Sequence, residues 1–291
     1  MYKKQFYMIE YTKKGEKMEF ILLFLIILIN SIALTIKLKN RIEVNIPISI
    51  IGLILIVYIF GLFDKLLLGV RVIEILTILV SVYALYTIIK NKKEINFKEQ
   101  ILTPGLFVYM FLYTGFIIFN KGMLFKEYDD FSHWGLVVKH MFNFGNFGAN
   151  SESVLQYNEY PPFIGIFQYI ILMLKNVYAE DAVITGLNIL YISFIIPMFK
   201  YIKWDKSILK LLIYIPIVVF VPIFFYEKFY VNLFMDGFMG CVFAYIIFSW
   251  YLNEDKNNER DLSVSLRIKC YSLNEINRNC IGSSSNNNIY N

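Results

Sequence analysis

Two adjacent acids, Asp129 and Asp130, lie in a polar stretch between apolar segments, and both histidines of the chain, His133 and His140, follow them closely. Neighbouring carboxylates repel each other, so each raises the pKa of the other unless a cation or a hydrogen-bond donor compensates. Such a pair could supply a general base, or it could hold a divalent metal such as Mg²⁺ or Mn²⁺ with His133 as a further ligand, together with a phosphate. The alternative is a solvated loop whose acids cap a helix at Ser132 and whose histidine faces water.

A third acid, Asp236, lies near the start of the last long apolar segment. An ionisable residue at the edge of a membrane span is by default a candidate functional residue. The alternative is a helix-start residue that the helix dipole favours. Arg71 and Glu74 also lie within an apolar segment, but their i, i+3 spacing predicts that they pair with each other and are structural.

The segments around these acids are too apolar for a soluble domain. Of the 291 residues, 57% are hydrophobic and 18% are charged, whereas soluble domains have about 45–50% and about 25%. Seven segments approach the ~20 residues that cross a bilayer, and they are predicted to be helices because backbone groups in lipid must be satisfied internally. These segments are residues 20–36, 46–63, 66–89, 101–119, 182–199, 208–226 and 233–252.

Charge and cysteine usage exclude two classes of protein. The net charge of +5 is spread over loops and chain ends, so no nucleic-acid partner is expected. The three cysteines, Cys241, Cys270 and Cys280, show neither metal nor disulfide spacing. We expect the lipid bilayer to be the main environment of this chain.

The expected fold is all-α: a polytopic transmembrane helical bundle of about seven spanning helices, with interfacial or re-entrant helices in an external loop. Residues 18–119 would hold four spanning helices, 120–181 the acidic and aromatic loop, and 182–252 three more helices. Residues 1–17 are interpreted as a short tail or as a translated leader, because residues 13–17 in A-rich codons would resemble a ribosome-binding site before Met18. The polar residues 253–291 predict either a disordered tail or a frameshift product, and the latter would make the chain the front part of a longer protein.

Basic residues between the apolar segments predict the orientation in the membrane. Lysine and arginine in short loops mark the cytoplasmic side, and the Ile, Lys, Asn, Phe and Tyr richness indicates an A+T-rich bacterial genome. The third basic cluster agrees with the first two only if the apolar segment 161–174 does not cross completely, so it would be re-entrant or interfacial. Asp129, Asp130 and Asp236 would then share the extracytoplasmic side of a bacterial cytoplasmic membrane. The three clusters are Lys37, Lys39 and Arg41; Lys90, Lys92, Lys93 and Lys98; and Lys200, Lys203, Lys206 and Lys210.

The residues after the acidic pair predict an amphipathic helix over 131–142. Phe131, Trp134, Val138 and Met141 would share one face of it. A helix with such a face lies in the membrane interface, and aromatic rings suit the depth of the lipid headgroups.

In their order along the chain, these residues resemble the GT-C superfamily of membrane glycosyltransferases, which includes protein O-mannosyltransferases and the aminoarabinose transferases of lipid A. The shared pattern is an acidic pair in a large external loop, interfacial helices, a Pro-Pro motif that opens the next apolar segment, and a further acid at the outer end of a later helix. The matching residues are Asp129 and Asp130, the helix 131–142, Tyr160, Pro161, Pro162 and Phe163, and Asp236. The resemblance covers residues 128–250.

The resemblance implies transfer of a sugar, with inversion, from a polyprenyl-phosphate or polyprenyl-diphosphate carrier to a glycan, glycolipid or protein acceptor outside the cytoplasm. Asp129 would be the base, and Asp130 and Asp236 would bind metal or acceptor. Contacts to substrate would come from His133, Trp134, Tyr160, Pro161 and Pro162, and the carrier phosphate would pair with Lys121, Lys126 or Lys139. Four helices precede the loop where better-known members have one, and the long run of later helices is missing, so a truncated, inactive form is the other expectation.

Two alternatives come from other classes of protein. A transporter or flippase component would place polar residues along a pathway across several helices. An accessory membrane subunit would use the loop to dock a partner. The ionisable residues of this chain gather at one external end of otherwise nearly uncharged helices, which favours chemistry at the membrane surface.

Overall fold

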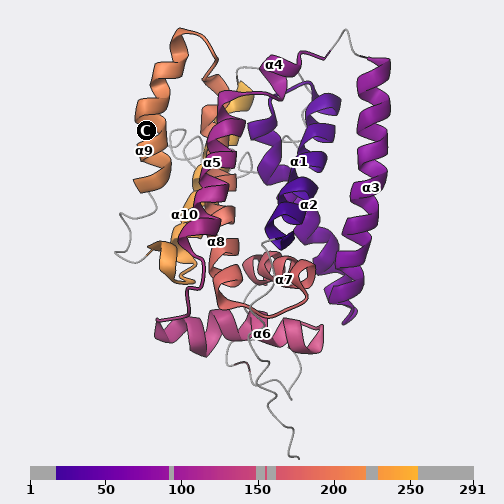
Figure 1. Ribbon diagram of the computed structural model, residues 1–291, viewed down its shortest axis with the longest axis vertical. Helices are drawn as coiled ribbons and strands as arrows, with labels where there is room; N and C mark the ends of the chain where they lie inside the picture. The colour runs from indigo at the N-terminus through magenta and orange to yellow at the C-terminus, as the bar shows by residue number, and fades with distance from the viewer. Residues whose placement is uncertain (1–17, 92–94, 149–154, 156–161, 221–228, 255–291) are drawn as a thin grey trace, which may run out of the picture. The chain divides into compact units, whose positions relative to one another are not determined.

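A computed structural model describes residues 18–91, 95–148, 155, 162–220 and 229–254. All regular secondary structure among these residues is helical, as the sequence predicts. The chain divides into two compact units, Met1–Val242 and Phe243–Asn291, and α10 contributes to both. The helices are α1 Met18–Leu38, α2 Ile42–Gly61, α3 Leu66–Lys90, α4 Phe97–Gln100, α5 Pro104–Phe119, α6 Gly135–Phe144, α7 Phe163–Lys175, α8 Glu180–Ile195, α9 Leu211–Phe220 and α10 Asp236–Glu254, with the short turns η1 Asp130–Trp134, η2 Ile196–Tyr201, η3 Lys206–Lys210 and η5 Phe229–Val231 (Figure 1).

Four helical stretches of the described chain are long and apolar enough to cross a membrane: α1, α2, α3 and the continuous run Glu180–Tyr201. The protein is therefore a membrane protein. Four further apolar helices are shorter: Pro104–Phe119, Phe163–Lys175, Ser207–Phe220 and Asp236–Trp250. The structure thus shows four of the seven spans that the sequence predicts, and the larger number stays a prediction.

Local chemistry sets where these helices begin. Thr103 caps α5, because its hydroxyl oxygen accepts the N–H of Leu106 at 3.2 Å, and Pro104 occupies the first helical position. Hydropathy alone places the second predicted helix at residue 46, whereas α2 begins at Ile42. The earlier start includes polar side chains that are buried and bonded within the protein, so the helix extends past the apolar run.

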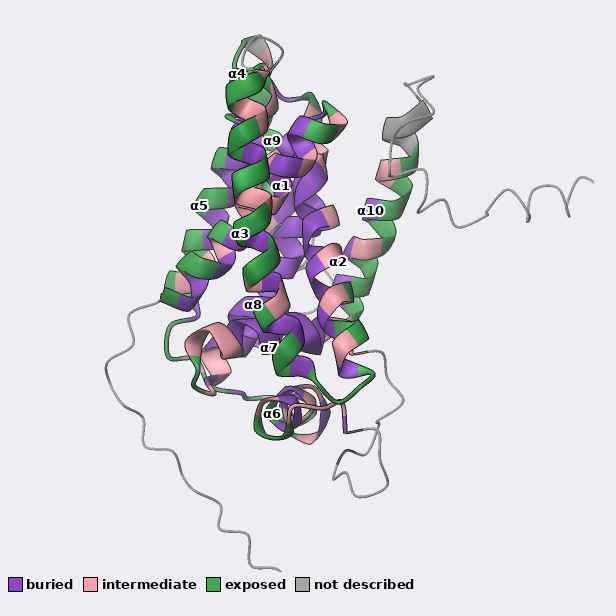
Figure 2. Ribbon diagram, turned by 90° about the vertical axis from the view of Figure 1, so that its right-hand side faces the viewer, coloured by how far each residue is buried: buried purple, intermediate pink, exposed green. Residues whose placement is uncertain are grey.

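The helix α8 is the centre of the first unit. It packs against α5 and α7, and its residues from Ala182 to Ile195 are all buried, whereas much of α3 is exposed (Figure 2). The hydroxyl groups of Tyr109 in α5 and Ser193 in α8 lie 3.0 Å apart, and both side chains are buried. Because α5 and α8 run antiparallel, this contact fixes their register and brings the lower end of α5 beside the first turn of α8.

The short apolar segment predicted to cross only partly forms α7. Its thirteen residues measure about 20 Å at 1.5 Å per residue, which is less than the ~30 Å of a hydrocarbon core. Figure 1 shows α7 lying across the lower ends of its neighbours rather than parallel to them. Residues from Ile164 to Leu172 are all buried. These features support the prediction of a partial crossing, which remains a prediction.

Polar side chains join the first three helices to one another. The side-chain nitrogen of Asn30 donates to the Thr77 hydroxyl at 3.0 Å, and the hydroxyls of Ser31 and Ser49 lie 2.8 Å apart. Hydrogen bonds of this kind stabilise helix packing in membranes. Arg71 and Glu74 pair at 2.8 Å, as their spacing predicts.

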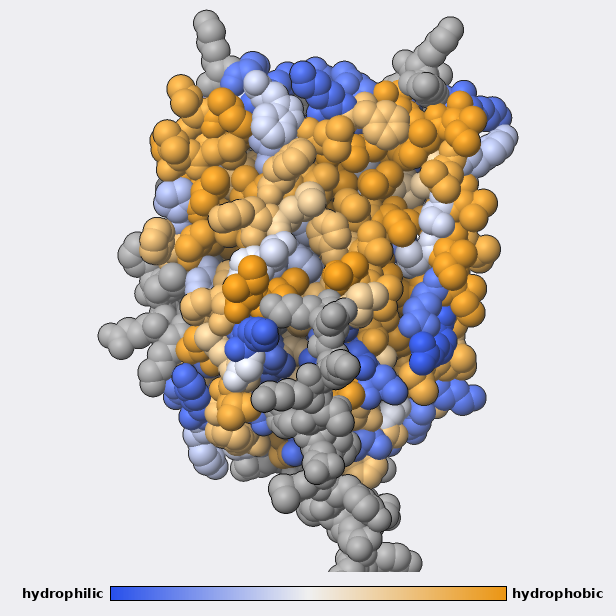
Figure 3. Space-filling model, in the orientation of Figure 1, coloured by the Kyte–Doolittle hydropathy of each residue, from blue (hydrophilic) through white to orange (hydrophobic). Residues whose placement is uncertain are grey.

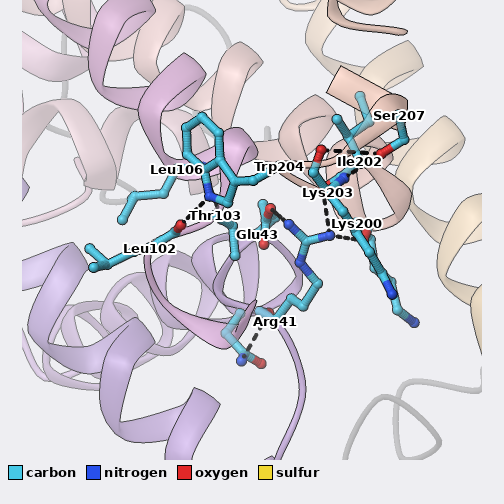
Figure 4. A network of polar contacts seen from close by, with 11 residues as sticks. Arg41, Glu43, Leu102, Thr103, Leu106, Lys200, Ile202, Lys203, Trp204 and Ser207 are labelled. Carbon is cyan, nitrogen blue, oxygen red and sulfur yellow. Dashed lines mark hydrogen bonds and ion pairs between the residues drawn. The ribbon is translucent and has the colours of Figure 1, made fainter. Parts of the chain in front are cut away.

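The described parts of the three basic clusters gather at one end of the helices, and Lys92 and Lys93 lie outside the described residues. Figure 1 places the α1–α2 connection, α4 and the start of α9 at the top and α6 at the bottom, and Figure 3 shows a hydrophilic rim above a largely hydrophobic face. Arg41 donates to the main-chain oxygens of Lys200 and Ile202, the latter at 2.8 Å. The indole nitrogen of Trp204 donates to the oxygen of Leu102 at 2.7 Å (Figure 4). That this end is cytoplasmic stays a prediction.

A buried ion pair organises this end. The guanidinium of Arg41 lies 3.0 Å from a carboxylate oxygen of Glu43, whose side chain is fully buried (Figure 4). A Cβ at Gly105 would overlap the Glu43 carboxyl, so α5 can approach α2 this closely only with glycine at that position.

Replacing Arg41 with Met is expected to lower the free energy of unfolding by about 3–5 kcal/mol, because the Glu43 carboxylate would stay buried without its cation. Unfolding of the detergent-solubilised protein measures the loss. Arg71→Met is the matched control: its pair with Glu74 has an arginine side chain that is 56% exposed, so about 0–1 kcal/mol is expected. Equal losses in the two variants would contradict the structural role of the buried pair.

Candidate acidic site

Asp130 is fully buried and binds main-chain N–H groups with both carboxylate oxygens. One oxygen accepts the N–H of Leu233 at 2.8 Å. The other accepts the N–H groups of Lys126 and Glu127 at 3.3 and 3.2 Å. Asp130 therefore ties the acidic loop to the stretch of chain that precedes α10, more than one hundred residues away in sequence.

Asp129, by contrast, is exposed. It lies on the turn that Asp130 anchors, so its backbone is held while its carboxylate faces outward. The neighbouring loop is fixed as well: the N–H of Phe125 donates to Glu180 at 2.8 Å and the N–H of Gly122 donates to Asp181 at 3.0 Å. Acids in the first turn of a helix are favoured by its dipole, and these two of α8 also bind the loop.

Burial shifts the pKa values of two side chains in this turn, Asp130 and His133. It raises the pKa of Asp130, and the N–H groups of Leu233, Glu127 and Lys126 oppose the shift because they stabilise the charged form. Burial lowers the pKa of His133, and the negative charge of Asp129 opposes that shift. A neutral imidazole is thus favoured beside an exposed carboxylate.

A helix is present where the sequence predicts an interfacial one, but its first residues are not α-helical, and its place at the membrane interface stays a prediction. Residues 130–134 form a π turn, and the regular helix α6 begins only at Gly135. Of the residues expected to share one face, Val138 and Met141 are buried, whereas Phe131 is 56% exposed. Each wider π turn adds a residue relative to the α-helical repeat, and the extra residue rotates Phe131 away from the face that holds Val138.

The C-terminal end of α6 is held to the first helices. The N–H of Leu66, at the start of α3, donates to the oxygen of Gly145 at 3.2 Å. Gly145 follows α6 with a φ of +70°, a left-handed conformation that glycine adopts without strain. The Nε2 atom of His140 lies 2.9 Å from the side-chain oxygen of Asn146, so the second histidine stabilises this turn.

The remaining predicted site residues are distributed around the same end. Asp236 is exposed and is the first residue of α10. Trp134 packs its ring against His133 at 4.3 Å between centroids. The ammonium of Lys139 lies 5.6 Å from the centre of the Tyr178 ring. Pro162 precedes α7 and Lys121 and Lys126 are exposed, whereas Tyr160 and Pro161 lie outside the described residues.

A metal held jointly by Asp129, Asp130 and His133 does not fit this arrangement. Asp130 is enclosed, and both of its oxygens already accept N–H donors. Within the described part of the chain, no three His, Cys, Asp or Glu residues form a group that could hold a metal ion. Asp129 and Asp236 keep accessible oxygens, so any cation at this end would have to bind there.

Sequence patterns missed four residues that shape the site. Glu180 and Asp181 could have been recognised as acids in the first turn of a predicted helix. Asn188 and Tyr191 could not have been recognised in this way, because the sequence does not show which groups a polar side chain inside an apolar segment binds. In the structure both contact the chain before α10.

The site thus combines the exposed Asp129 with the buried Asp130, which anchors its turn. A second exposed acid, Asp236, follows three residues after Leu233, whose N–H donates to Asp130. Comparisons of the chain with protein-family models, with curated proteins and with solved structures each gave no match.

Proposed function

We propose that this protein is a membrane glycosyltransferase that moves a sugar from a polyprenyl-phosphate-type carrier to an extracytoplasmic acceptor. The observation that supports it is the difference in exposure between the two adjacent acids. Asp130 is enclosed and bound by N–H groups, whereas Asp129 is exposed on the turn that Asp130 holds. A positioned and accessible carboxylate is what a general base requires.

In the proposed reaction, the acceptor hydroxyl oxygen attacks the anomeric carbon of the carrier-linked sugar, and Asp129 takes the hydroxyl proton. A new carbon–oxygen bond forms as the bond between the anomeric carbon and the phosphate oxygen breaks. The polyprenyl phosphate leaves with the bonding electron pair. One base is sufficient for transfer with inversion, since no covalent sugar–enzyme intermediate forms.

Cations near the turn support the departure of the phosphate. Lys121 and Lys126 are exposed in the loop that leads to Asp129, and Lys139 is exposed on α6, ten residues after Asp129. Positive charge placed where a leaving group gains negative charge stabilises the transition state. Asp236, exposed at the same end, is assigned to the acceptor.

We place the site at the extracytoplasmic end of the helices in a bacterial cytoplasmic membrane. The acidic site and the basic clusters lie at opposite ends (Figure 1), and lysine-rich ends face the cytoplasm. The polar side chains inside α1 to α3 bond to one another, which is the behaviour of packing contacts rather than of a transport pathway.

Deletion and complementation of the gene test the function. Mass spectrometry of the glycolipids and glycoproteins of the cell envelope should show at least one species that loses a sugar on deletion and regains it on complementation. Identical glycan profiles in the deletion strain and its parent, with the protein present in the parental membrane, would contradict a glycosyltransferase.

A further inference from the structure

The stretch that leads into α10, residues 230–235, is here called the lead-in. It is irregular after Val231, and its middle residues Asn232 and Leu233 are buried, at 0% and 2% exposure. It lies beside Asn188, the ninth residue of α8, which is about 12 Å along that helix. Non-helical backbone at the depth of a membrane helix is stable only where protein or water satisfies its polar groups.

Three side chains from two other parts of the chain bind the main chain of the lead-in. The side-chain nitrogen of Asn188 donates to the oxygen of Tyr230 at 2.9 Å. The hydroxyl of Tyr191 donates to the oxygen of Phe234 at 3.2 Å. The third is the bond from Leu233 N–H to Asp130. Asn188 and Tyr191 are spaced i, i+3 and so lie on one face of α8.

The first turn of α10 is held against the same face. Phe238 is 1% exposed, and its ring lies 5.8 Å from Tyr191 and 5.2 Å from Phe194 between centroids. The same ring stacks 6.2 Å from Phe163 of α7, between centroids. Asp236 lies between this packed ring and the lead-in, so both neighbours fix its position while its carboxylate stays exposed.

We propose that Asn188 and Tyr191 are positioning residues for the acidic site. By binding the lead-in together with Asp130, they hold Asp236 at the same end as Asp129, where it orients the acceptor. Three residues of chain reach at most about 10 Å, so Asp236 cannot move far from the Leu233 amide that Asp130 binds. This role of Asp236 rests on the proposed function, whereas the hold on the lead-in does not.

Hydrogen exchange of the purified full chain tests the hold on the lead-in. In Tyr191→Phe, the amides of residues 230–236 should exchange about threefold to tenfold faster, because local opening loses one neutral hydrogen bond. Asn188→Leu should act in the same direction. Tyr109→Phe is the matched control: it removes an equally buried hydroxyl that bonds Ser193 of α8, so lead-in exchange should not change. Unchanged exchange in both test variants would overturn the proposal.

Sugar-transfer assays test whether Tyr191 affects activity by positioning Asp236. The probe is a mixture of radiolabelled polyprenyl-phosphate mannose, glucose and galactose, with membranes of the deletion strain as acceptor. Asp236→Asn and Tyr191→Phe should each lower incorporation, and the double variant should be no slower than Asp236→Asn, since residues that act through one another are not additive. Multiplied losses would overturn the positioning role.

The hydrogen-exchange and transfer experiments distinguish a failure of the positioning proposal from a failure of the proposed function. If wild type transfers no label, the glycosyltransferase and the acceptor role of Asp236 are both overturned. The exchange result then still decides whether Asn188 and Tyr191 hold the lead-in.

Discussion

Replacing Asp129 with Asn is expected to lower sugar transfer by about 10²–10⁴-fold, which is the usual contribution of a positioned general base. Asparagine keeps the size of the side chain but cannot take the acceptor proton. Because Asp129 is exposed, its carboxylate contributes little to folding, and the variant should reach the membrane in normal amounts. Release of polyprenyl phosphate from the labelled donor measures the rate, and protein in the membrane fraction normalises it.

Asp64→Asn is the matched control for this variant. Asp64 is also exposed, and it lies in the α2–α3 turn at the end of the helices where α6 lies (Figure 1). Its φ of +55° is left-handed, a conformation that asparagine tolerates well. The control should therefore transfer sugar at the wild-type rate. A rate for Asp129→Asn equal to that of the control would contradict Asp129 as the base.

The helices could be predicted from sequence because the relevant signal is local. Long apolar runs define α1, α2 and α3 to within a few residues. The errors arose where contacts distant in sequence decide the boundary. The start of α2 lies at Ile42, where the buried Glu43 pairs with Arg41. Arg41 in turn is held by the main-chain oxygens of Lys200 and Ile202, and hydropathy cannot report such an ion pair.

The different surroundings of the two adjacent acids could not be predicted from their spacing, whereas their roles and the side of the membrane on which they lie stay predictions. Sequence treats Asp129 and Asp130 as equivalent neighbours. In the structure Asp130 is buried and accepts the N–H of Leu233, 103 residues away, whereas Asp129 is exposed. The π turn that exposes Phe131 could not be predicted either, because a wider turn forms only where tertiary contacts favour it over the regular helix.

Tyr191 shows most clearly which residues sequence patterns cannot identify. Its ring fits an apolar segment, and nothing in the sequence distinguishes it from Tyr109 on a different helix. Only the folded chain shows that one hydroxyl binds the lead-in and the other binds Ser193. Residues that position a site through main-chain contacts are therefore found from coordinates and not from composition.

Removing the Asp130 side chain is expected to cost more folding stability than any other change at the site. Asp130→Ala would leave three N–H groups, those of Lys126, Glu127 and Leu233, without their acceptor. Each buried donor without a partner costs about 1–3 kcal/mol, so a loss of about 3–5 kcal/mol is expected, with partial relaxation of the loop. Asp130→Asn keeps one acceptor oxygen and should lose less, about 1–3 kcal/mol.

The pH dependence of stability distinguishes this role from simple packing. Because burial raises the pKa of Asp130 above its ordinary 3.8, the folded state holds the proton more tightly than the unfolded state. The stabilisation is complete below pH 3.8 and is lost as the pH rises through the raised folded value. Wild type should thus lose stability relative to Asp130→Asn, whose side chain does not titrate, across that interval. Parallel unfolding curves for the two proteins over the whole pH series would show that Asp130 titrates as in the unfolded chain, and that the main-chain donors balance its burial.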